Sequence, residues 1–309
     1  MFRTCGSGYG IKRLSEMTGL SRHVLRKWEQ RYNLLSPQRA KNGYRVYAPE
    51  ESQLLFFLKH RLNTGASIGW LALQGREALI HEMNAGPIDV RHVPQDAQPQ
   101  AHELIQAARG NDRTTVERTI TSLIQQWGFD RALTGVFFPV LQTIGELWHQ
   151  GRISVVGEQL VSQTIQQLLS QQLQSIPGAS ETDHPQALIA CMPDDFHEIG
   201  AMSAVRFLRH GGWKVTYLGP DVSIDVVRLA CRRRHAKLVL FSLVVELASD
   251  DMKDLIDEIV RHVLPLTTVV MGGRGADFYK DWLERKGIRY IDDIERVKEL
   301  TPRSRTTMT

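Results

Sequence analysis

The stretch Asp195-Phe-His-Glu-Ile-Gly200 lies between two apolar segments with different spacing. Before it, Ala187-Leu-Ile-Ala-Cys-Met192 is a short apolar run typical of a buried strand. After it, residues 201–210 space their apolar side chains as a helix does, and Gly211-Gly212 ends that helix. The sequence therefore predicts that His197 lies on a loop leaving the carboxyl end of a strand, which is where open parallel sheets bind ligands.

The chain beyond this unit continues to alternate strands and helices. Further strands are predicted at apolar runs, namely residues 213–218, 238–242, 267–271 and 289–291. Helical spacing is found between them, at residues 224–233, 250–263 and 277–286. This alternation predicts a doubly wound parallel sheet of the flavodoxin-like kind over residues 184–309.

Two of the predicted strands end in short motifs, Ser242-Leu243-Val244 and Gly272-Gly273. Together with the Asp-x-His-x-x-Gly pattern at 195–200, they resemble the motifs of cobalamin-binding domains, in the same order and at strand ends. The resemblance implies that His197 is the lower axial ligand of cobalt. It also implies that the other motif residues bind the cofactor: Asp195, Gly200, Ser242, Val244, Gly272 and Gly273.

The chemistry of these residues suits that role. Asp195 can accept the second ring proton of His197, which fixes the tautomer and raises the basicity of the ligating nitrogen. Asp195 can also cap the following helix, and the two roles are compatible. The alternative is that His197 is a loop histidine satisfied by a neighbour in another flavodoxin-like domain. Three motifs in the family order favour the cobalamin interpretation.

Positive charge is concentrated at the start of the chain. The net charge of the 309 residues is only +4, but residues 1–80 hold 13 Lys or Arg and 5 Asp or Glu. The first 80 residues therefore carry +8 and the remainder carries −4. This asymmetry predicts a polyanionic partner for the first part, with nucleic acid favoured.

The basic region has the pattern of a winged helix-turn-helix. Residues 11–17 form a short amphipathic helix, Thr18-Gly19-Leu20 turns the chain, and Ser21 is a good N-cap for a second helix that runs to about residue 32. Asn42-Gly43 then predicts a hairpin with basic and tyrosine side chains around it. Two further helices are expected at residues 50–63 and 67–80.

This block resembles the DNA-binding domain of MerR-type regulators over about seventy residues. The most specific matches are the Trp-Glu-x-Arg-Tyr segment at 28–32 and the Gly-Tyr-Arg-x-Tyr wing at 43–47. The resemblance implies that helix and wing residues contact double-stranded operator DNA: Arg22, Arg26, Arg39, Tyr44 and Arg45. The alternative is a solvated basic face, and Trp28 is expected in the core rather than against a base.

A proline-containing segment, 85–100, separates this domain from four amphipathic helices within 101–183. The segment is expected to be a flexible linker, and the four helices a bundle. Cobalamin-dependent MerR-type regulators carry such a bundle over the upper face of the corrin, marked by Trp, nine residues, and Glu-His. Trp148 and Glu158 match this mark, and the resemblance implies that they contact the adenosyl group. The alternatives are a core tryptophan and a glutamate favoured by the helix dipole.

Gln159 stands where that family has the histidine that replaces the upper ligand after light breaks the cobalt–carbon bond. An amide is a poorer cobalt ligand than an imidazole. A second imidazole is therefore not supplied from this position, and His149 or water are the alternatives.

The sequence thus predicts a multidomain chain: a mainly α winged helix-turn-helix at 1–84, a linker at 85–100, a four-helix bundle at 101–183 and an α/β domain at 184–309. The resemblance implies a DNA-binding transcriptional regulator of the cytoplasm. By the same resemblance it would be a photoreceptor and repressor that uses adenosylcobalamin and forms a dimer or tetramer. Its alternatives are a cofactor-independent regulator driven by protein partners, and a corrinoid carrier of a methyltransferase or mutase system.

The sequence shows no catalytic constellation, so an enzyme is not expected. Its three cysteines are far apart and have no metal-binding spacing, which fits a reducing compartment. No apolar run approaches membrane-spanning length and the first residues lack a signal-peptide h-region, so a cytoplasmic protein is expected.

Overall fold

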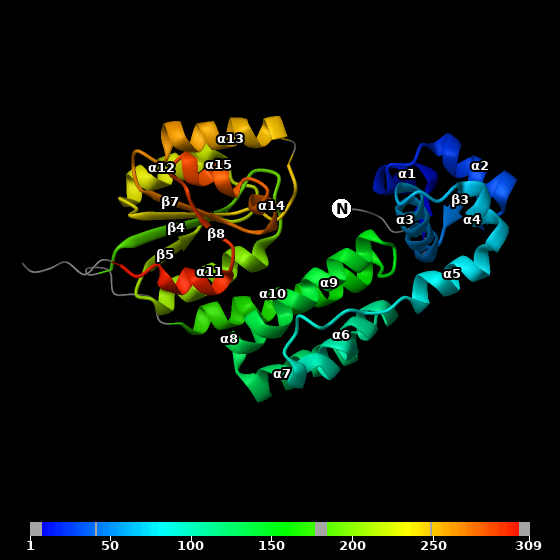
Figure 1. Cartoon of the computed structure of the whole chain (residues 1–309), viewed down its shortest axis with the longest axis horizontal. Coiled ribbons are helices and arrows are strands. Elements are labelled where there is room, and N and C mark those ends of the chain that lie inside the picture. Colours follow the sequence, from blue (N-terminus) through cyan, green and yellow to red (C-terminus); the bar gives the residue numbers. More distant parts are fainter. Residues whose placement is uncertain (1–7, 41, 177–183, 248, 303–309) are drawn as a thin grey trace, which may run out of the picture. The chain divides into compact units, whose positions relative to one another are not determined.

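The computed structural model describes residues 8–40, 42–176, 184–247 and 249–302. The chain divides into two compact units, Met1–Thr164 and Ile165–Thr309, and each is considered separately below (Figure 1). Of the three cysteines, Cys191 and Cys231 are buried free thiols, and Cys5 lies outside the described residues. In the part of the chain that the structure describes, no helix has the length and apolar character needed to cross a bilayer.

The first unit begins with the predicted helix-turn-helix and wing. Gly19 ends the first helix in a left-handed conformation, and the hydroxyl of Ser21 caps the second by accepting from the backbone N–H of Val24. Three short antiparallel strands form the wing in the order β1-β3-β2. The elements are α1 (Ile11–Thr18), α2 (Arg22–Tyr32), β1 (Tyr9–Gly10), β2 (Gln38–Arg39) and β3 (Arg45–Tyr47).

Three more helices complete this domain: α3 (Pro49–Asn63), α4 (Ile68–Gln74) and α5 (Arg76–Ala85). Apolar side chains of α1, α2 and α3 form one core, in which Leu14, Leu25 and Leu54 are fully buried. Trp28 is 5% exposed within it, as expected of a core residue.

The segment expected to be a flexible linker is instead packed against the helices that follow it. Val93 and Ala97 are buried, a 3₁₀ turn forms at Gln95–Ala97, and helix α6 (Gln98–Gly110) already begins inside the segment. The guanidinium of Arg109 donates to the carbonyl oxygens of Asn84 (3.1 Å) and Gly86 (3.2 Å). The burial of Val93 and Ala97 and the hydrogen bonds of Arg109 together hold the segment in place, because the first removes apolar surface from water and the second satisfy backbone acceptors.

The predicted bundle is present, with one irregularity. Its helices are α6, α7 (Arg113–Trp127), α8 (Phe129–Ala132), α9 (Phe138–His149) and α10 (Val155–Ser175). A π-helical turn at Leu133–Phe137 joins α8 to α9, so the helical stretch from Phe129 to His149 is not one regular α-helix. Pro139 has no N–H to donate to Gly135, so the regular hydrogen-bond ladder is broken next to this turn.

The second unit contains the predicted parallel sheet, with the strand order β5-β4-β6-β7-β8. Its strands are β4 (Gln186–Cys191), β5 (Lys214–Tyr217), β6 (Leu238–Ser242), β7 (Thr268–Gly272) and β8 (Arg289–Ile291). Every described pairing in it is parallel. The strand order reverses direction at β4, so the crevice beyond the carboxyl end of β4 is the topological switch point.

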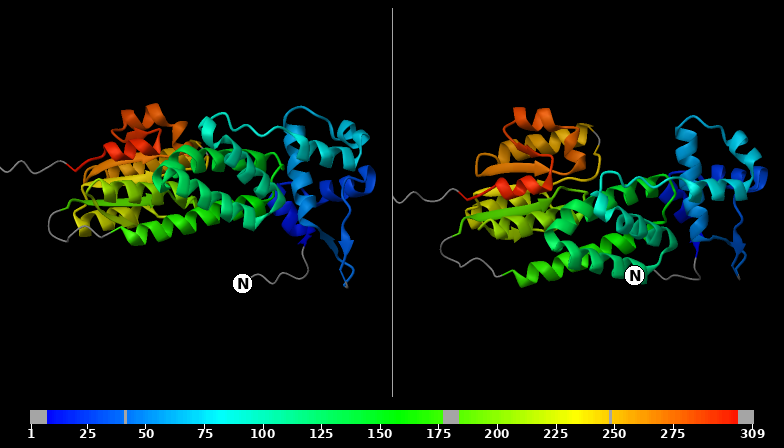
Figure 2. Two further views of the ribbon diagram at one scale, coloured as in Figure 1. Left: turned by 90° about the horizontal axis from the view of Figure 1, so that it is seen from below. Right: turned by 60° about the horizontal axis from the view of Figure 1, so that its bottom comes forward.

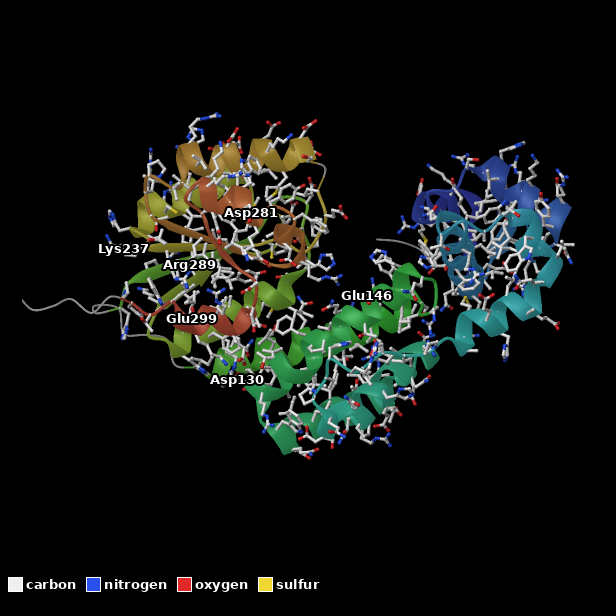
Figure 3. The ribbon with its side chains drawn as sticks, viewed as in Figure 1. Asp130, Glu146, Lys237, Asp281, Arg289 and Glu299 are labelled. Carbon is white, nitrogen blue, oxygen red and sulfur yellow. The ribbon has the colours of Figure 1, made fainter. Side chains whose placement is uncertain are left out.

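Helices cover both faces of this sheet (Figures 1 and 2). They are α11 (Glu198–His210), α12 (Ile224–Arg234), α13 (Ser249–His262), α14 (Arg274–Asp277), α15 (Lys280–Arg285) and the 3₁₀ helix η3 (Ile294–Glu299). Leu188, Ala190 and Phe241 share a core with α12 and α13, whereas α11 lies on the opposite side of the sheet (Figure 1). At the edge of the sheet, Arg289 of β8 pairs with Glu299 of η3 at 3.4 Å (Figure 3).

Candidate cofactor and nucleic-acid sites

His197 occupies the N-cap position of α11, on the loop that follows β4. Its side chain is 60% exposed, whereas the side chain of Asp195 is fully buried beneath it. One oxygen of Asp195 accepts from the backbone N–H of His197 (2.9 Å) and lies 2.8 Å from Nδ1 of the same residue. The other oxygen accepts from the backbone N–H of Val244. Asp195 therefore holds the imidazole and joins its loop to the end of β6.

The electrostatics fix the state of this pair. Burial raises the pKa of Asp195, but the hydrogen bonds donated by His197 and Val244 outweigh burial and leave the pKa below its ordinary value. An ionised carboxylate at Nδ1 favours the tautomer with its proton on Nδ1 and its lone pair on Nε2. The arrangement suits an imidazole that presents Nε2 to a metal.

The predicted strand-end motifs come together at the same level of the sheet. Cys191 at the end of β4 pairs with Ser242 of β6, and Ser242 pairs with Gly272 of β7. Ser242 is 5% exposed, and a Cβ on Gly200 would lie 3.5 Å from its Oγ. The structure thus gathers His197, Gly200, Ser242 and Gly272 at the carboxyl edge, as predicted from their positions at strand ends.

Gly273 has a specific steric reason to be glycine. Its φ is +106°, and a Cβ there would lie 2.2 Å from the carbonyl oxygen of Leu243. Only glycine allows this conformation and this approach without strain. Gly273 therefore packs the loop after β7 directly against the loop after β6, which keeps the carboxyl edge compact beside His197.

Glu198 is a residue of this edge that the sequence analysis did not single out. Its carboxylate accepts from the hydroxyl of Tyr217 (2.8 Å) on β5 and from the amide of Gln166 (3.0 Å) on α10. The thiol of Cys191 donates to the carbonyl oxygen of His197 at 3.7 Å. The backbone around His197 is thus anchored to β4, β5 and α10. In the sequence, the role of Glu198 is indicated only by its position next to the histidine.

Trp148 and Glu158 belong to the first unit, so it stays a prediction that they bind the same cofactor as His197. Trp148 is half-buried on α9, with ring centroids 6.1 Å from Phe56 of α3 and 4.5 Å from His149. Its indole Nε1 is buried without an acceptor among the described residues. Glu158 is half-buried in the first turn of α10, and Gln159 is exposed. The buried indole N–H of Trp148 fits a bound cofactor that supplies a hydrogen-bond acceptor.

The predicted DNA-binding side chains fall into two groups. Arg22 and Arg26 are exposed on α2, and Arg39 and Tyr44 are exposed on the wing, with Tyr44 at 74%. Arg45 differs, because its side chain is 28% exposed and its Nε lies 2.9 Å from the carboxylate of Glu29. Four of the five therefore remain accessible to a duplex, and Arg45 is held by Glu29 of α2.

Known families match all three parts of the chain. The MerR HTH family of regulatory proteins matches residues 9–70. One B12 binding domain family matches residues 185–300, and a second matches residues 100–171. The chain therefore contains a MerR-type HTH domain and B12-binding domains.

Two relatives match this chain along nearly their whole length. The chain is 29% identical over 298 residues to the HTH-type transcriptional repressor CarH of Myxococcus xanthus, covering 93% of this chain and 96% of the relative. It is 27% identical over 296 residues to the repressor CarA of the same organism, covering 93% and 94%. A monomethylamine corrinoid protein of Methanosarcina barkeri has a similar fold, with a TM-score of 0.53 at 16% identity over 66% of this chain and 97% of that one.

Proposed function

We propose that the chain is a light-responsive transcriptional repressor whose oligomeric state and operator binding depend on bound adenosylcobalamin. The observation that carries this proposal is His197, an exposed imidazole held by a buried carboxylate at the switch point of a parallel sheet. Two relatives that match nearly the whole chain are named transcriptional repressors. Their names support the repressor role and a function other than catalysis.

Bound cobalamin would supply a cobalt centre with an alkyl bond that light can break. His197 would bind the cobalt, with Asp195 orienting the ring. Trp148 and Glu158 would contact the adenosyl group. The indole N–H of Trp148, which has no acceptor among the residues that the structure describes, supports that assignment. Oligomerisation of several chains would bring their helix-turn-helix domains onto one duplex, which raises their effective concentration there.

The test is reconstitution of the purified chain with adenosylcobalamin in darkness. We expect the protein to keep the colour of the corrinoid after desalting, and its absorbance to change after green light. Size-exclusion chromatography and a gel shift, run on the same samples before and after illumination, should show a change of oligomeric state and loss of DNA binding. A coloured protein whose DNA affinity is unchanged by light would remove the light response from the proposal. A colourless protein would remove the cofactor.

We expect Arg22 and Arg26, which are exposed on the recognition helix α2, to contact DNA directly. Replacing Arg22 or Arg26 with alanine is expected to weaken binding and, where the lost contact is with phosphate, to lower the slope of log affinity against log salt by about 0.9 per contact. Fluorescence anisotropy over a salt series measures both quantities. Arg118→Ala, which changes an exposed arginine on bundle helix α7 paired with Glu103, should change neither.

A further inference from the structure

The two most specific motifs of the DNA-binding domain meet at one side chain, Glu29. Glu29 lies on the recognition helix α2 and is only 16% exposed. Both of its carboxylate oxygens lie 2.9 Å from Nε of Arg45, and one also accepts from the hydroxyl of Tyr47 at 3.2 Å. Arg45 and Tyr47 are both on β3, so one carboxylate on the helix holds two residues of the wing.

This contact sits at the centre of the wing. Strand β3 is the middle strand of the sheet, and Arg45 pairs directly with Arg39 of β2. Tyr47 is fully buried, so β3 is anchored in the domain core at one end. The exposed Arg39 lies on β2, and the exposed Tyr44 directly precedes β3. The position of both residues relative to α2 is therefore set through Glu29.

The protonation states agree with this geometry. Burial, followed by the nearby Glu29 carboxylate, raises the pKa of Tyr47 to about 12. The hydrogen bond to Glu29 raises the pKa of Arg45. Both wing side chains thus remain donors at neutral pH, and a hydrogen bond between ionised partners is stronger than a neutral one.

We propose that Glu29 is a positioning residue for DNA binding, which sets the wing relative to the recognition helix through Arg45 and Tyr47, and that Arg45 acts through Glu29 rather than by gripping a phosphate. The inference rests on the proposed DNA-binding function. Loss of the Glu29 charge is then expected to change the DNA affinity in the direction opposite to the one that simple electrostatics predicts. Removing a negative charge from a DNA-binding face should tighten binding to a polyanion, whereas loosening the wing should weaken it.

The experiment uses the full chain, incubated with adenosylcobalamin in the dark, and a duplex that this chain selects from a random-sequence library. Affinity is measured by fluorescence anisotropy over a salt series for Glu29→Gln, Arg45→Ala, the double variant and Arg39→Ala. We expect Glu29→Gln and Arg45→Ala each to weaken binding about tenfold with the salt slope unchanged. The double variant should be little weaker than either single one, because both changes remove the same contact. Arg39→Ala should instead lower the slope by about 0.9.

Thermal unfolding identifies a variant that does not fold. If Glu29→Gln is such a variant, Tyr47→Phe decides, because it keeps the buried ring and removes only the hydroxyl. Its affinity should then fall two- to fivefold with the slope unchanged. Equal or tighter binding by Glu29→Gln or Tyr47→Phe would overturn the inference, and so would a slope lowered by about 0.9 in Arg45→Ala. A wild-type chain that selects no duplex would overturn the proposed function itself, and with it this inference.

Discussion

Replacing His197 with alanine is expected to lower the affinity for adenosylcobalamin at least about 100-fold, because the change removes the imidazole that the proposed site offers to cobalt. The measurement is the corrinoid absorbance that stays with the protein after desalting, titrated against added cofactor in the dark. Loss of the imidazole should also remove its characteristic contribution to the absorbance of any cofactor that is still bound.

A graded series makes this result specific. Asp195→Asn keeps the size of the side chain but loses the charge that orients Nδ1, and should lower the affinity about 10- to 100-fold. His262→Ala removes an exposed histidine from the last turn of α13 and should leave the affinity unchanged. Full retention of cofactor by His197→Ala, with the absorbance of the wild type, would show that cobalt is held by another residue.

The second large effect is expected at Gly151, where the bundle meets the DNA-binding domain. Gly151 has a φ of +72°, and a Cβ there would lie 2.3 Å from the backbone nitrogen of Phe57 and 2.4 Å from the carbonyl oxygen of Gln53. Both contacts are with the backbone of α3, which cannot move aside as a flexible side chain can. Gly151→Ala should therefore destabilise the first unit by at least about 2 kcal/mol, through backbone strain and displacement of α3.

Gly145 provides the matched control. It lies six positions earlier, inside helix α9, and apart from the neighbouring backbone of its own helix no described atom comes within 4 Å of a Cβ placed there. Gly145→Ala should be neutral or stabilise the protein by about 0.5–1 kcal/mol, since alanine is the better helix former. Denaturant unfolding gives the two free energies, and amide hydrogen exchange should show faster opening of α3 only in Gly151→Ala. Equal stability of the two variants would mean that α3 does not pack on Gly151 in solution.

Much of this fold could be predicted because its signals are local. Ser21 caps α2 through a bond to a residue three positions away, and Asp195 reaches His197 across two positions. The strand-end motifs could be placed together because parallel strands bring their carboxyl ends to one edge. In each case a short stretch of sequence carries both partners or a rule of topology joins them.

The rest depends on contacts between distant residues. The bond between Gln166 and Glu198 spans 32 positions, and that between Glu29 and Arg45 spans 16. Nothing in the composition of residues 85–100 reveals that Arg109 and Arg152 would hold its start, or that Val93 would be buried. Prolines indicate only that such a segment lacks regular structure, and tertiary packing decides whether it is mobile.

The contact between Trp148 and Phe56 has a mechanical consequence. The ring of Trp148, which is predicted to contact the cofactor, packs against Phe56 of α3. Helix α3 belongs to the domain that is predicted to bind DNA. An indole N–H without an acceptor costs about 1–3 kcal/mol, so any incoming group that offers one draws the ring toward itself. A displacement of the Trp148 ring would change its contact with Phe56 and so act directly on α3.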